Sequence, residues 1–569
     1  MLCRKAIDAA PRAPALLLFL VLWLVPPVQA APAAVAMPDR YSAAAAQQVM
    51  LAGGNAVDAA IAAAFVLAVT YPEAGNIGGG GFMLSYMQDE AAFLDFRERA
   101  PLAAHRDMYL DGQGNFVQQR ALIGGLAAGV PGTVRGLQAA HQRYGTLPWA
   151  QLLQAAIELA SNGFVVPPEL AQMAAGKIAE TAGKTNFAEY FSGLQDGRTF
   201  VQPELAHTLQ LIARDPDSFY RGEIARKITA QMRASGGIIS AQDLAAYRAV
   251  WRTPLQYYWR GLQVLTAPPP SSGGIALLQL LGIREFAQPL FAGVAPNSPQ
   301  YVHLLAEIEK RVFADRAQYL GDSDFVDVPV GRLLDPLYLQ ERARSLNPAG
   351  ISAGAAIEPG LESHQTTHFS IVDGSGNAVA LTYTLNWEFG SGVVVAGAGF
   401  LLNNEMDDFS AKPGVPNKFG VVGNDRNAIE PGKRMLSSMT PTLLLRDGRP
   451  ELVIGTPGGS TIFTSIYQVI LNLYLHDMPL QAAVDATRFH HQLPDAGLIR
   501  HDRRELPAAT RDKLEQLGYT LEPNSWGDLG DIQVIRLAPA TLEAASDSRG
   551  RGRAEVFEEA GTAENFSLE

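Results

Sequence analysis

Cysteine is almost absent from this sequence of 569 residues, with Cys3 as its single example. Basic residues followed by the apolar run 15–25 and by small residues before Ala30 predict a secretory signal peptide over residues 1–30. An uncleaved anchor is the alternative, although the run is short for a membrane span. Once the signal is removed, no cysteine remains for a disulfide, a nucleophile or a metal site. We therefore expect a periplasmic or secreted protein held together by its core.

Positive charge is also scarce. Lys and Arg number 45 against 57 Asp and Glu, which gives a formal net charge of −12 and argues against nucleic-acid binding. No run after residue 30 is long and apolar enough to cross a bilayer, so no stable membrane span is expected in the mature form. The 47% hydrophobic content predicts a large packed core.

Several common catalytic motifs are missing: there is no G-x-S-x-G, no P-loop and no H-E-x-x-H. The glycine-rich stretch 75–81 precedes a strand rather than a helix, so it indicates close backbone approach more than phosphate binding. His364 and His368 are four residues apart but flank a strand start, so we predict neither a metal site nor a cofactor. The pair His490 and His491 is interpreted as structural.

Residues 365–386 have the pattern of a β-hairpin. The stretch 365–372 alternates polar and apolar residues, 373–377 is rich in turn formers, and 378–386 reads as a second strand. Antiparallel pairing about this turn places Thr384 opposite Thr366, with Asn386 two residues further along the same face. Two facing threonines can simply be an ordinary pair that stabilises a sheet.

A chemical interpretation of the hairpin rests on what precedes it. Residues 346–364 are rich in glycine and alanine and are predicted to be exposed. If the chain were cut before Thr366, the new α-amine, with a pKa of about 8, would lie beside its own hydroxyl, and one residue would supply nucleophile and base. A strand-to-helix turn at Gly458 and Gly459 offers backbone N–H groups for an oxyanion.

The chain resembles the γ-glutamyltransferases (glutathione hydrolases) of the N-terminal nucleophile hydrolase superfamily. The resemblance covers nearly all of the mature chain and rests on ordered motifs: GGNAVDAA, GGGGFML, LDFRERAP, ADRAQYLGD, TTHFSIVD, LLNNEMDDFSAKPGVPN, SSMTPT and TPGGS. It implies an α+β fold, a four-layer αββα sandwich. It also implies self-cleavage into a large subunit, 31–365, and a small catalytic subunit, 366–569, which form one folded heterodimer. Polar composition predicts a disordered tail at 546–569.

The resemblance also implies roles for individual residues. Thr366 would be the nucleophile of self-cleavage and of γ-glutamyl transfer, hydrogen-bonded by Thr384. The remaining implied residues are Arg97, Ser437 and Ser438 for the substrate α-carboxylate, Asn386, Glu405 and Asp408 for its α-amino group, and Gly458 and Gly459 for the oxyanion. The implied donors are glutathione and other γ-glutamyl compounds, and the acceptors are water, amino acids or dipeptides.

Phe419 lies in a stretch, 413–423, that matches the lid loop of some bacterial members of the family. A well-known bacterial relative carries tyrosine at this position, and its hydroxyl bonds the asparagine that matches Asn386. Phenylalanine has no such donor. Lid closure is therefore expected to differ here or to rest on apolar packing.

Two other functions fit parts of this pattern. A related acylase would remove glutaryl side chains from a β-lactam nucleus, but it has no need of the ammonium site that Glu405 and Asp408 suggest. A non-enzymatic alternative is a periplasmic amino-acid-binding or scaffold protein that never undergoes cleavage.

Overall fold

A computed structural model describes residues 32–352, 365–412, 424–524, 527–538 and 541–559. The predicted signal peptide, 1–30, and the predicted lid residue Phe419 lie outside these ranges, as do residues 353–364 of the segment before Thr366. Over the described ranges, every helix is too short or too polar to traverse a bilayer.

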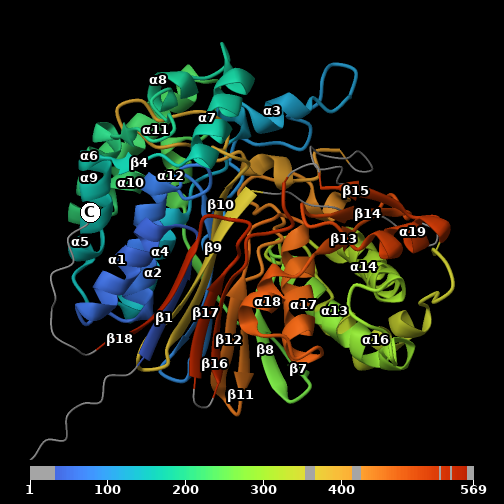
Figure 1. The fold of residues 1–569 in the computed structure, drawn as a ribbon. Coiled ribbons are helices and arrows are strands. Elements are labelled where there is room, and N and C mark those ends of the chain that lie inside the picture. The colour runs from blue at the N-terminus through green and yellow to red at the C-terminus, as the bar shows by residue number, and fades with distance from the viewer. Residues whose placement is uncertain (1–31, 353–364, 413–423, 525–526, 539–540, 560–569) are drawn as a thin grey trace, which may run out of the picture.

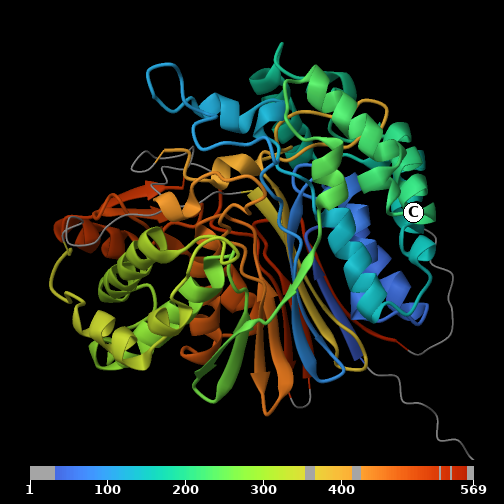
Figure 2. The same ribbon diagram turned by 180° about the vertical axis from the view of Figure 1, so that it is seen from behind.

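The chain folds into four layers, with two β-sheets face to face and helices covering the outer face of each (Figures 1 and 2). This arrangement confirms the predicted αββα sandwich. The first sheet contains, in spatial order, β18 (Arg553–Glu558), β1 (Pro32–Met37), β9 (Gln365–Val372), β10 (Ala378–Asn386), β2 (Gly80–Met87), β3 (Glu90–Asp95) and β6 (Val250–Arg252). The second contains β17 (Thr541–Ser546), β16 (Gln533–Ala538), β12 (Arg449–Gly455), β11 (Thr442–Arg446), β8 (Leu262–Thr266) and β7 (Leu255–Trp259).

The helices divide between the two outer layers (Figure 1). Beside the first sheet lie α1 (Arg40–Leu51), α2 (Ala56–Thr70), α4 (Thr133–Tyr144), α5 (Trp149–Leu152), α6 (Gln154–Asn162), α7 (Pro168–Thr181), α8 (Phe187–Phe191), α9 (Pro203–Arg214), α10 (Ser218–Arg221), α11 (Glu223–Ala234) and α12 (Ala241–Ala246). Beside the second lie α13 (Gly273–Phe286), α14 (Pro299–Tyr319), α15 (Val330–Leu333), α16 (Pro336–Arg344), α17 (Thr461–Tyr474) and α18 (Leu480–Asp485).

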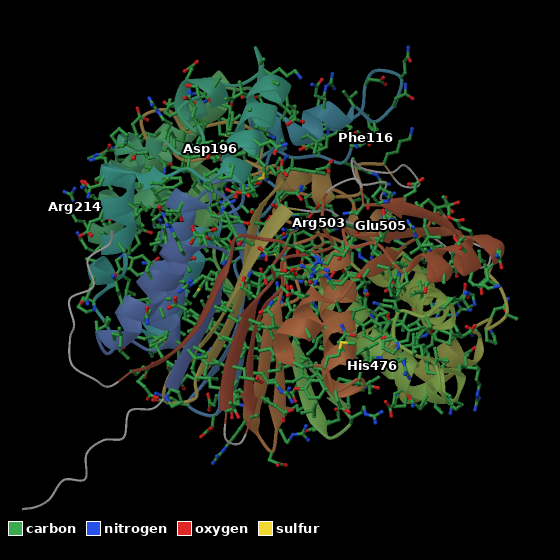
Figure 3. All side chains as sticks on the ribbon, viewed as in Figure 1. Phe116, Asp196, Arg214, His476, Arg503 and Glu505 are labelled. Atoms are coloured by element: carbon green, nitrogen blue, oxygen red, sulfur yellow. The ribbon has the colours of Figure 1, made fainter. Side chains whose placement is uncertain are left out.

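The remaining elements are small. They are α3 (Gln118–Leu122), α19 (Ala508–Gln516), the pair β4 (Phe164–Val165) and β5 (Thr199–Phe200), and a three-stranded sheet of β13 (Phe489–His491), β14 (Leu498–His501) and β15 (Thr520–Pro523). Side chains fill the spaces between the layers (Figure 3). One apolar core lies between the first sheet and its helices, and a second lies between the two sheets and around α13, α14 and α17.

The alanine-rich N-terminal helices pack closely. All fifteen residues of α2 are buried, and small side chains let it lie against both α1 and the first sheet. Asn55 begins α2 with a capping box, because its side chain accepts from the N–H of Asp58 while the Asp58 carboxylate accepts from the N–H of Asn55.

The hairpin of β9 and β10 has the predicted register, with Thr384 directly opposite Thr366. The two faces of β9 differ as their pattern requires. Phe369 and Ile371 belong to the core under the helices, whereas Ser370 donates to the carbonyl of Gln533 in the second sheet. Side chains two residues apart on a strand share a face, so Thr366 lies with Ser370 on the face toward the second sheet.

The glycine-rich stretch before β2 allows β2 to approach β10 closely. A Cβ at Gly79 would stand 2.0 Å from the carbonyl oxygen of Thr384, and one at Gly81 would stand 2.4 Å from that of Thr382. No side chain fits at these distances. The prediction of close backbone approach is confirmed, and its partner is the strand that carries Thr384.

The prediction of a disordered tail at 546–569 is wrong for its described part. Residues 553–558 form β18, which pairs with β1 along six residues. The polar side chains that suggested disorder are paired: Asp547 bonds Arg488 at 2.6 Å, and Arg549 bonds Asp502 at 2.7 Å, all nearly fully buried. Composition alone does not reveal that opposite charges meet in the fold. Residues 560–569 lie outside the described ranges.

Arg551 attaches this C-terminal arm to the helical layer. Its guanidinium lies 2.6 Å from the Glu73 carboxylate, which is 3% exposed, and 4.1 Å from the centre of the Tyr71 ring. We expect Arg551→Ala to lower the free energy of unfolding by about 3 kcal/mol, because Glu73 loses its buried partner. The midpoint of urea unfolding measures this change.

Arg553→Ala is the matched control for that measurement. Arg553 pairs with Glu555 on the same strand, but its side chain is 61% exposed, so its loss should cost less than about 0.5 kcal/mol. Equal midpoints for the two variants would contradict a stabilising role of the Arg551 contact.

Candidate active site

The two facing threonines lie where β9 begins and β10 ends (Figure 1). Thr366 is 7% exposed and Thr384 is 1% exposed. The Thr384 hydroxyl oxygen accepts a hydrogen bond of 2.7 Å from the backbone N–H of Asn386. Thr366 thus keeps a small exposed area at the end of its strand, as a group that reacts with a bound molecule needs.

The prediction that Asn386 continues the same face does not describe this end of β10. The register shifts between Thr384 and Asn386, and Asn386 has a φ of +78°. A bulge of this kind interrupts the alternation of side chains. The Asn386 amide instead donates to the carbonyl of Asn404 at 3.0 Å, which ties the strand end to the acidic turn that follows Asn404.

His368 holds β9 against the second sheet below Thr366. Its ring nitrogens lie 2.7 Å from the Thr382 hydroxyl and 3.1 Å from the Ser370 hydroxyl. Burial lowers the pKa of His368 to about 3, so the ring is neutral. Gly455, the last residue of β12, packs directly on this ring, where a Cβ would stand 2.3 Å from it.

Arg97, just after β3, is the centre of a buried ion cluster. Its Nη1 donates to Glu405, and its Nη2 donates to Asp408 at 2.5 Å. Its Nη2 also bonds the carbonyl of Leu436 at 3.2 Å. The sequence predicted a cation and two acids at opposite ends of a bound molecule. In the structure they bond one another.

Burial and charge act against each other in this cluster. Burial disfavours the charged form of Arg97, but the carboxylates of Glu405, Asp408 and Glu98 more than offset this and raise its pKa. Burial raises the pKa of Glu405 while the guanidinium lowers it. Because Arg97 donates directly to Glu405, we regard that carboxylate as ionised.

Glu98 is a member of the cluster that the sequence reasoning did not single out, although it follows Arg97 directly. It is fully buried, and its carboxylate lies 3.9 Å from the guanidinium. Burial raises the pKa of Glu98 to about 8, and nearby Arg97 lowers it only in part. Glu98 also packs against Gly80, which pairs with Thr384, so the ion cluster adjoins the threonine pair.

The serine pair lies beside Arg97, because the carbonyl that Arg97 bonds belongs to the residue before Ser437. The Ser437 carbonyl accepts from the N–H of Ser272 at 2.6 Å and from its hydroxyl at 2.7 Å, which fixes the loop. The Ser438 hydroxyl is buried, and no residue in the described ranges hydrogen-bonds to it. It remains able to bond a bound molecule.

The glycine turn lies just beyond the contact of β12 with His368. Gly458 and Gly459 have φ values of +132° and +57°, which other residues adopt only with strain. The residue after this turn is fixed by side chains. The Ser460 hydroxyl donates to the Gln492 side chain at 2.8 Å, and Gln492 lies 2.9 Å from the ring of His490. His490, predicted to be structural, thus supports this turn through Gln492, a contact that joins residues 30 positions apart and could not be predicted from the local pattern.

Taken together, the described candidates form two adjoining groups. Thr366 and Thr384 form the first group, with the turn at Gly458 near the two strands that bear them. Arg97 and its acids form the second, joined to the first through Glu98 and Asn386. Two facing sheets covered by helices, with a buried threonine at the start of an inner strand, are the architecture of the N-terminal nucleophile hydrolase class.

Comparison with known proteins gives the family. The model of the gamma-glutamyltranspeptidase family matches residues 42–557, and the chain belongs to this family. A glutathione hydrolase proenzyme of Pseudomonas aeruginosa is 58% identical over 521 residues, which cover 91% of this chain and 93% of that protein.

Solved structures of related proteins have a similar fold. The crystal structure of cephalosporin acylase from Bacillus halodurans has a TM-score of 0.82 at 27% identity, covering 98% of this chain and 99% of that one. A chain of gamma-glutamyltranspeptidase from Pseudomonas nitroreducens complexed with L-DON has a TM-score of 0.56 at 54% identity, covering 57% of this chain and 96% of that one.

The raised pKa of Glu98 gives a prediction about pH. Below about pH 8 Glu98 is protonated and neutral, and above it Glu98 adds a further negative charge, 3.9 Å from Arg97, to those of Glu405 and Asp408. This charge competes for the guanidinium with the carboxylate of a bound amino acid. We therefore expect the KM for a γ-glutamyl donor to rise between pH 8 and 9.5 in the wild type, and to rise less in Glu98→Gln.

Steady-state kinetics of both proteins at matched pH values provide the measurement. The donor's own amine titrates in the same range but affects both proteins equally, so the ratio of the two KM values isolates Glu98. A ratio that stays constant from pH 7 to 9.5 would argue that Glu98 does not titrate there.

Proposed function

We propose that the chain cleaves itself between Gln365 and Thr366 into a large subunit, 31–365, and a small subunit, 366–569. The sheets support a stable pair of subunits after such a cut. In the first sheet, β1 of the large subunit lies between β9 and β18 of the small one, and in the second β11 pairs with β8. Separating the subunits would break both sheets, so the product would be a tightly joined heterodimer.

In the proposed reaction, the free α-amine of Thr366 takes the proton from its own hydroxyl, which attacks the γ-carbonyl of glutathione or another γ-glutamyl amide. Backbone N–H groups at Gly458 and Gly459 stabilise the oxyanion. The intermediate collapses to a γ-glutamyl ester of Thr366, and the leaving amine takes the proton. Water, an amino acid or a dipeptide then attacks the ester. Thr384 would orient the nucleophile.

The observation that carries this proposal is the ion cluster beside the threonine pair. Arg97, with Ser437 and Ser438, would bind the α-carboxylate of the γ-glutamyl group. Glu405, Asp408 and Asn386 would bind its ammonium. A zwitterionic end would give a partner both to the guanidinium and to the carboxylates of this site. A substrate with only one charged group would leave one of them without a partner.

The main alternative is an acylase that removes glutaryl groups, and the similarity to a cephalosporin acylase favours it as the second candidate. The higher identity to a glutathione hydrolase proenzyme and the acids beside Arg97 favour the γ-glutamyl reaction. Rates of hydrolysis of γ-glutamyl and glutaryl anilides distinguish the two activities.

We also propose export to the periplasm or medium, on the evidence of the apolar run within 1–30.

Thr366→Ala tests the nucleophile. We expect one uncut chain and no measurable activity, because the variant lacks the hydroxyl that starts both reactions. Intact mass and N-terminal sequencing of the purified protein provide the measurement. Thr367→Val is the control. Thr367 is 1% exposed and alternates with Thr366 along β9, so its side chain lies on the face toward the helices. We expect this variant still to be cleaved. Two fragments from Thr366→Ala would refute the assignment.

Arg97→Lys tests the carboxylate site. Lysine keeps the positive charge but replaces the flat, forked guanidinium by one ammonium, which cannot bond Glu405, Asp408 and a ligand together. We expect the KM for the donor to rise about 10- to 100-fold, equivalent to losing one or two charge-assisted hydrogen bonds. Circular dichroism checks folding. A folded variant with an unchanged KM would contradict the proposed role.

A further inference from the structure

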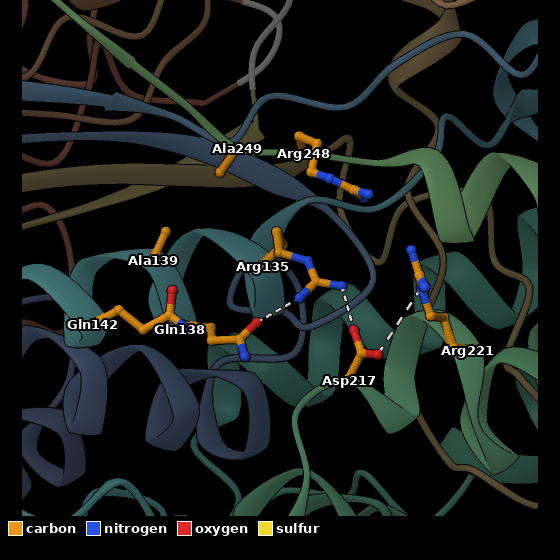
Figure 4. A pocket seen from close by; sticks show the side chains of 8 residues that line it. All are labelled: Arg135, Gln138, Ala139, Gln142, Asp217, Arg221, Arg248 and Ala249. Carbon is orange, nitrogen blue, oxygen red and sulfur yellow. Dashed lines mark hydrogen bonds and ion pairs between the residues drawn. The ribbon is translucent and has the colours of Figure 1, made fainter.

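Three arginines that the candidate active site does not use lie close together in the helical layer beside the first sheet. A cavity of about 330 Å³ opens between α4, α10 and the segment after α12 (Figure 4). Its lining residues are Arg135, Gln138, Ala139, Gln142, Asp217, Arg221, Arg248 and Ala249. None of these belongs to the candidate active site, and no proposed step of the reaction uses them.

Arg135 is held rigidly at one wall. Its Nη1 donates to Gln138 at 2.6 Å and its Nη2 donates to Asp217 at 2.7 Å. Its guanidinium also stacks on the ring of Tyr220 at 4.3 Å. The Nε is buried, and no residue in the described ranges hydrogen-bonds to it. A guanidinium fixed in this way loses little conformational entropy when it binds a ligand.

Arg221 and Arg248 approach from the opposite wall. Both donate to the carbonyl of Ala245, at 3.2 and 2.9 Å, so one backbone oxygen holds two like-charged side chains together. Their guanidinium ends point toward each other in Figure 4. Each guanidinium has five N–H donors, and the described hydrogen bonds of these two side chains occupy one terminal nitrogen of each. The Nε of Arg221 also lies 4.0 Å from the Asp217 carboxylate, so this one acid contacts both Arg135 and Arg221.

The charge of the cavity is opposite to that of the whole chain. Three arginines face a single acid, Asp217, which leaves an excess of two positive charges in a chain of net charge −12. Like charges gathered in one cavity repel one another, and a bound anion of charge −2 would remove this repulsion.

We propose that this cavity binds a phosphate group, either as inorganic phosphate or as the monoester of a small organic molecule. A doubly charged tetrahedral anion matches the excess charge and offers several oxygens to three forked donors. The volume exceeds that of phosphate alone and lies at the lower end of the range for small-molecule sites. The two glutamines at the wall supply neutral polar groups for the organic part.

Isothermal titration calorimetry at low ionic strength tests the site, with inorganic phosphate and glycerol 3-phosphate as probes and glycerol as the neutral control. We expect saturable binding with a Kd of roughly 1 mM or tighter. Tighter binding of glycerol 3-phosphate identifies a monoester site, and equal binding identifies a site for free phosphate. Absence of saturable binding for both probes overturns the proposal.

Variants locate the binding. Arg221→Gln with Arg248→Gln should weaken it at least about tenfold, because two charged donors are lost. Asp217→Asn should tighten it about three- to tenfold, because it removes a negative charge while keeping an acceptor for Arg135. This gain cannot come from damage to the fold.

The matched control changes the same net charge elsewhere. Arg226→Gln with Arg233→Gln removes two exposed arginines of α11, and binding should stay within about twofold of the wild type. Equal loss in both double variants would show an effect of overall charge and would overturn the proposed site. Binding unchanged by Arg221→Gln with Arg248→Gln would place the anion elsewhere and would overturn it too.

Discussion

The pairing of β9 with β10 is the constraint on which the rest of the site depends. With Thr366 opposite Thr384, Thr366, His368 and Ser370 lie on the face toward the second sheet, and Phe369 and Ile371 face the helices. A slip of one residue would exchange these faces. It would bury His368 among apolar side chains and remove its bonds to Thr382 and Ser370. The cost of that exchange fixes the register, and the register fixes the position of Thr366.

The same constraint explains the glycines before β2. β10 lies between β9 and β2, so whatever positions β10 also positions Thr384. Gly79 and Gly81 allow β2 to approach β10 at distances that a Cβ would prevent. The strand that carries the second threonine is thus held from both sides, on one by the hairpin and on the other by a stretch without side chains.

Much of this could be predicted from the sequence, because it follows from local pattern. The alternation in 365–372 and the turn at 373–377 predicted the hairpin, and the glycine run predicted close approach. The bulge before Asn386 could not be predicted, since it depends on the bond from Asn386 to Asn404. Nor could the order of the arm at 547–558, whose charges are paired with residues about 45 to 480 positions away. The cavity at Arg135 likewise joins three distant segments.

The ion cluster shows what can and cannot be deduced from residue types. Arg97, Glu405 and Asp408 were predicted as ligands for opposite ends of one molecule, but not as partners of each other. Buried charges need partners, and the mutual pairing of Arg97 with Glu405 and Asp408 meets that need. A bound molecule must then replace these pairs without leaving a charge alone.

This requirement favours one class of ligand. An α-amino acid end brings one carboxylate and one ammonium. In the proposed site, Arg97 would exchange a protein carboxylate for that of the ligand, while the released acid would gain the ammonium. A glutaryl group brings only the carboxylate. Its binding would leave Glu405 or Asp408 ionised in a buried site without a cation, or would require that acid to take up a proton. Either outcome costs several kcal/mol. Selectivity for a γ-glutamyl group would therefore follow from charge balance in the cluster as much as from any single hydrogen bond.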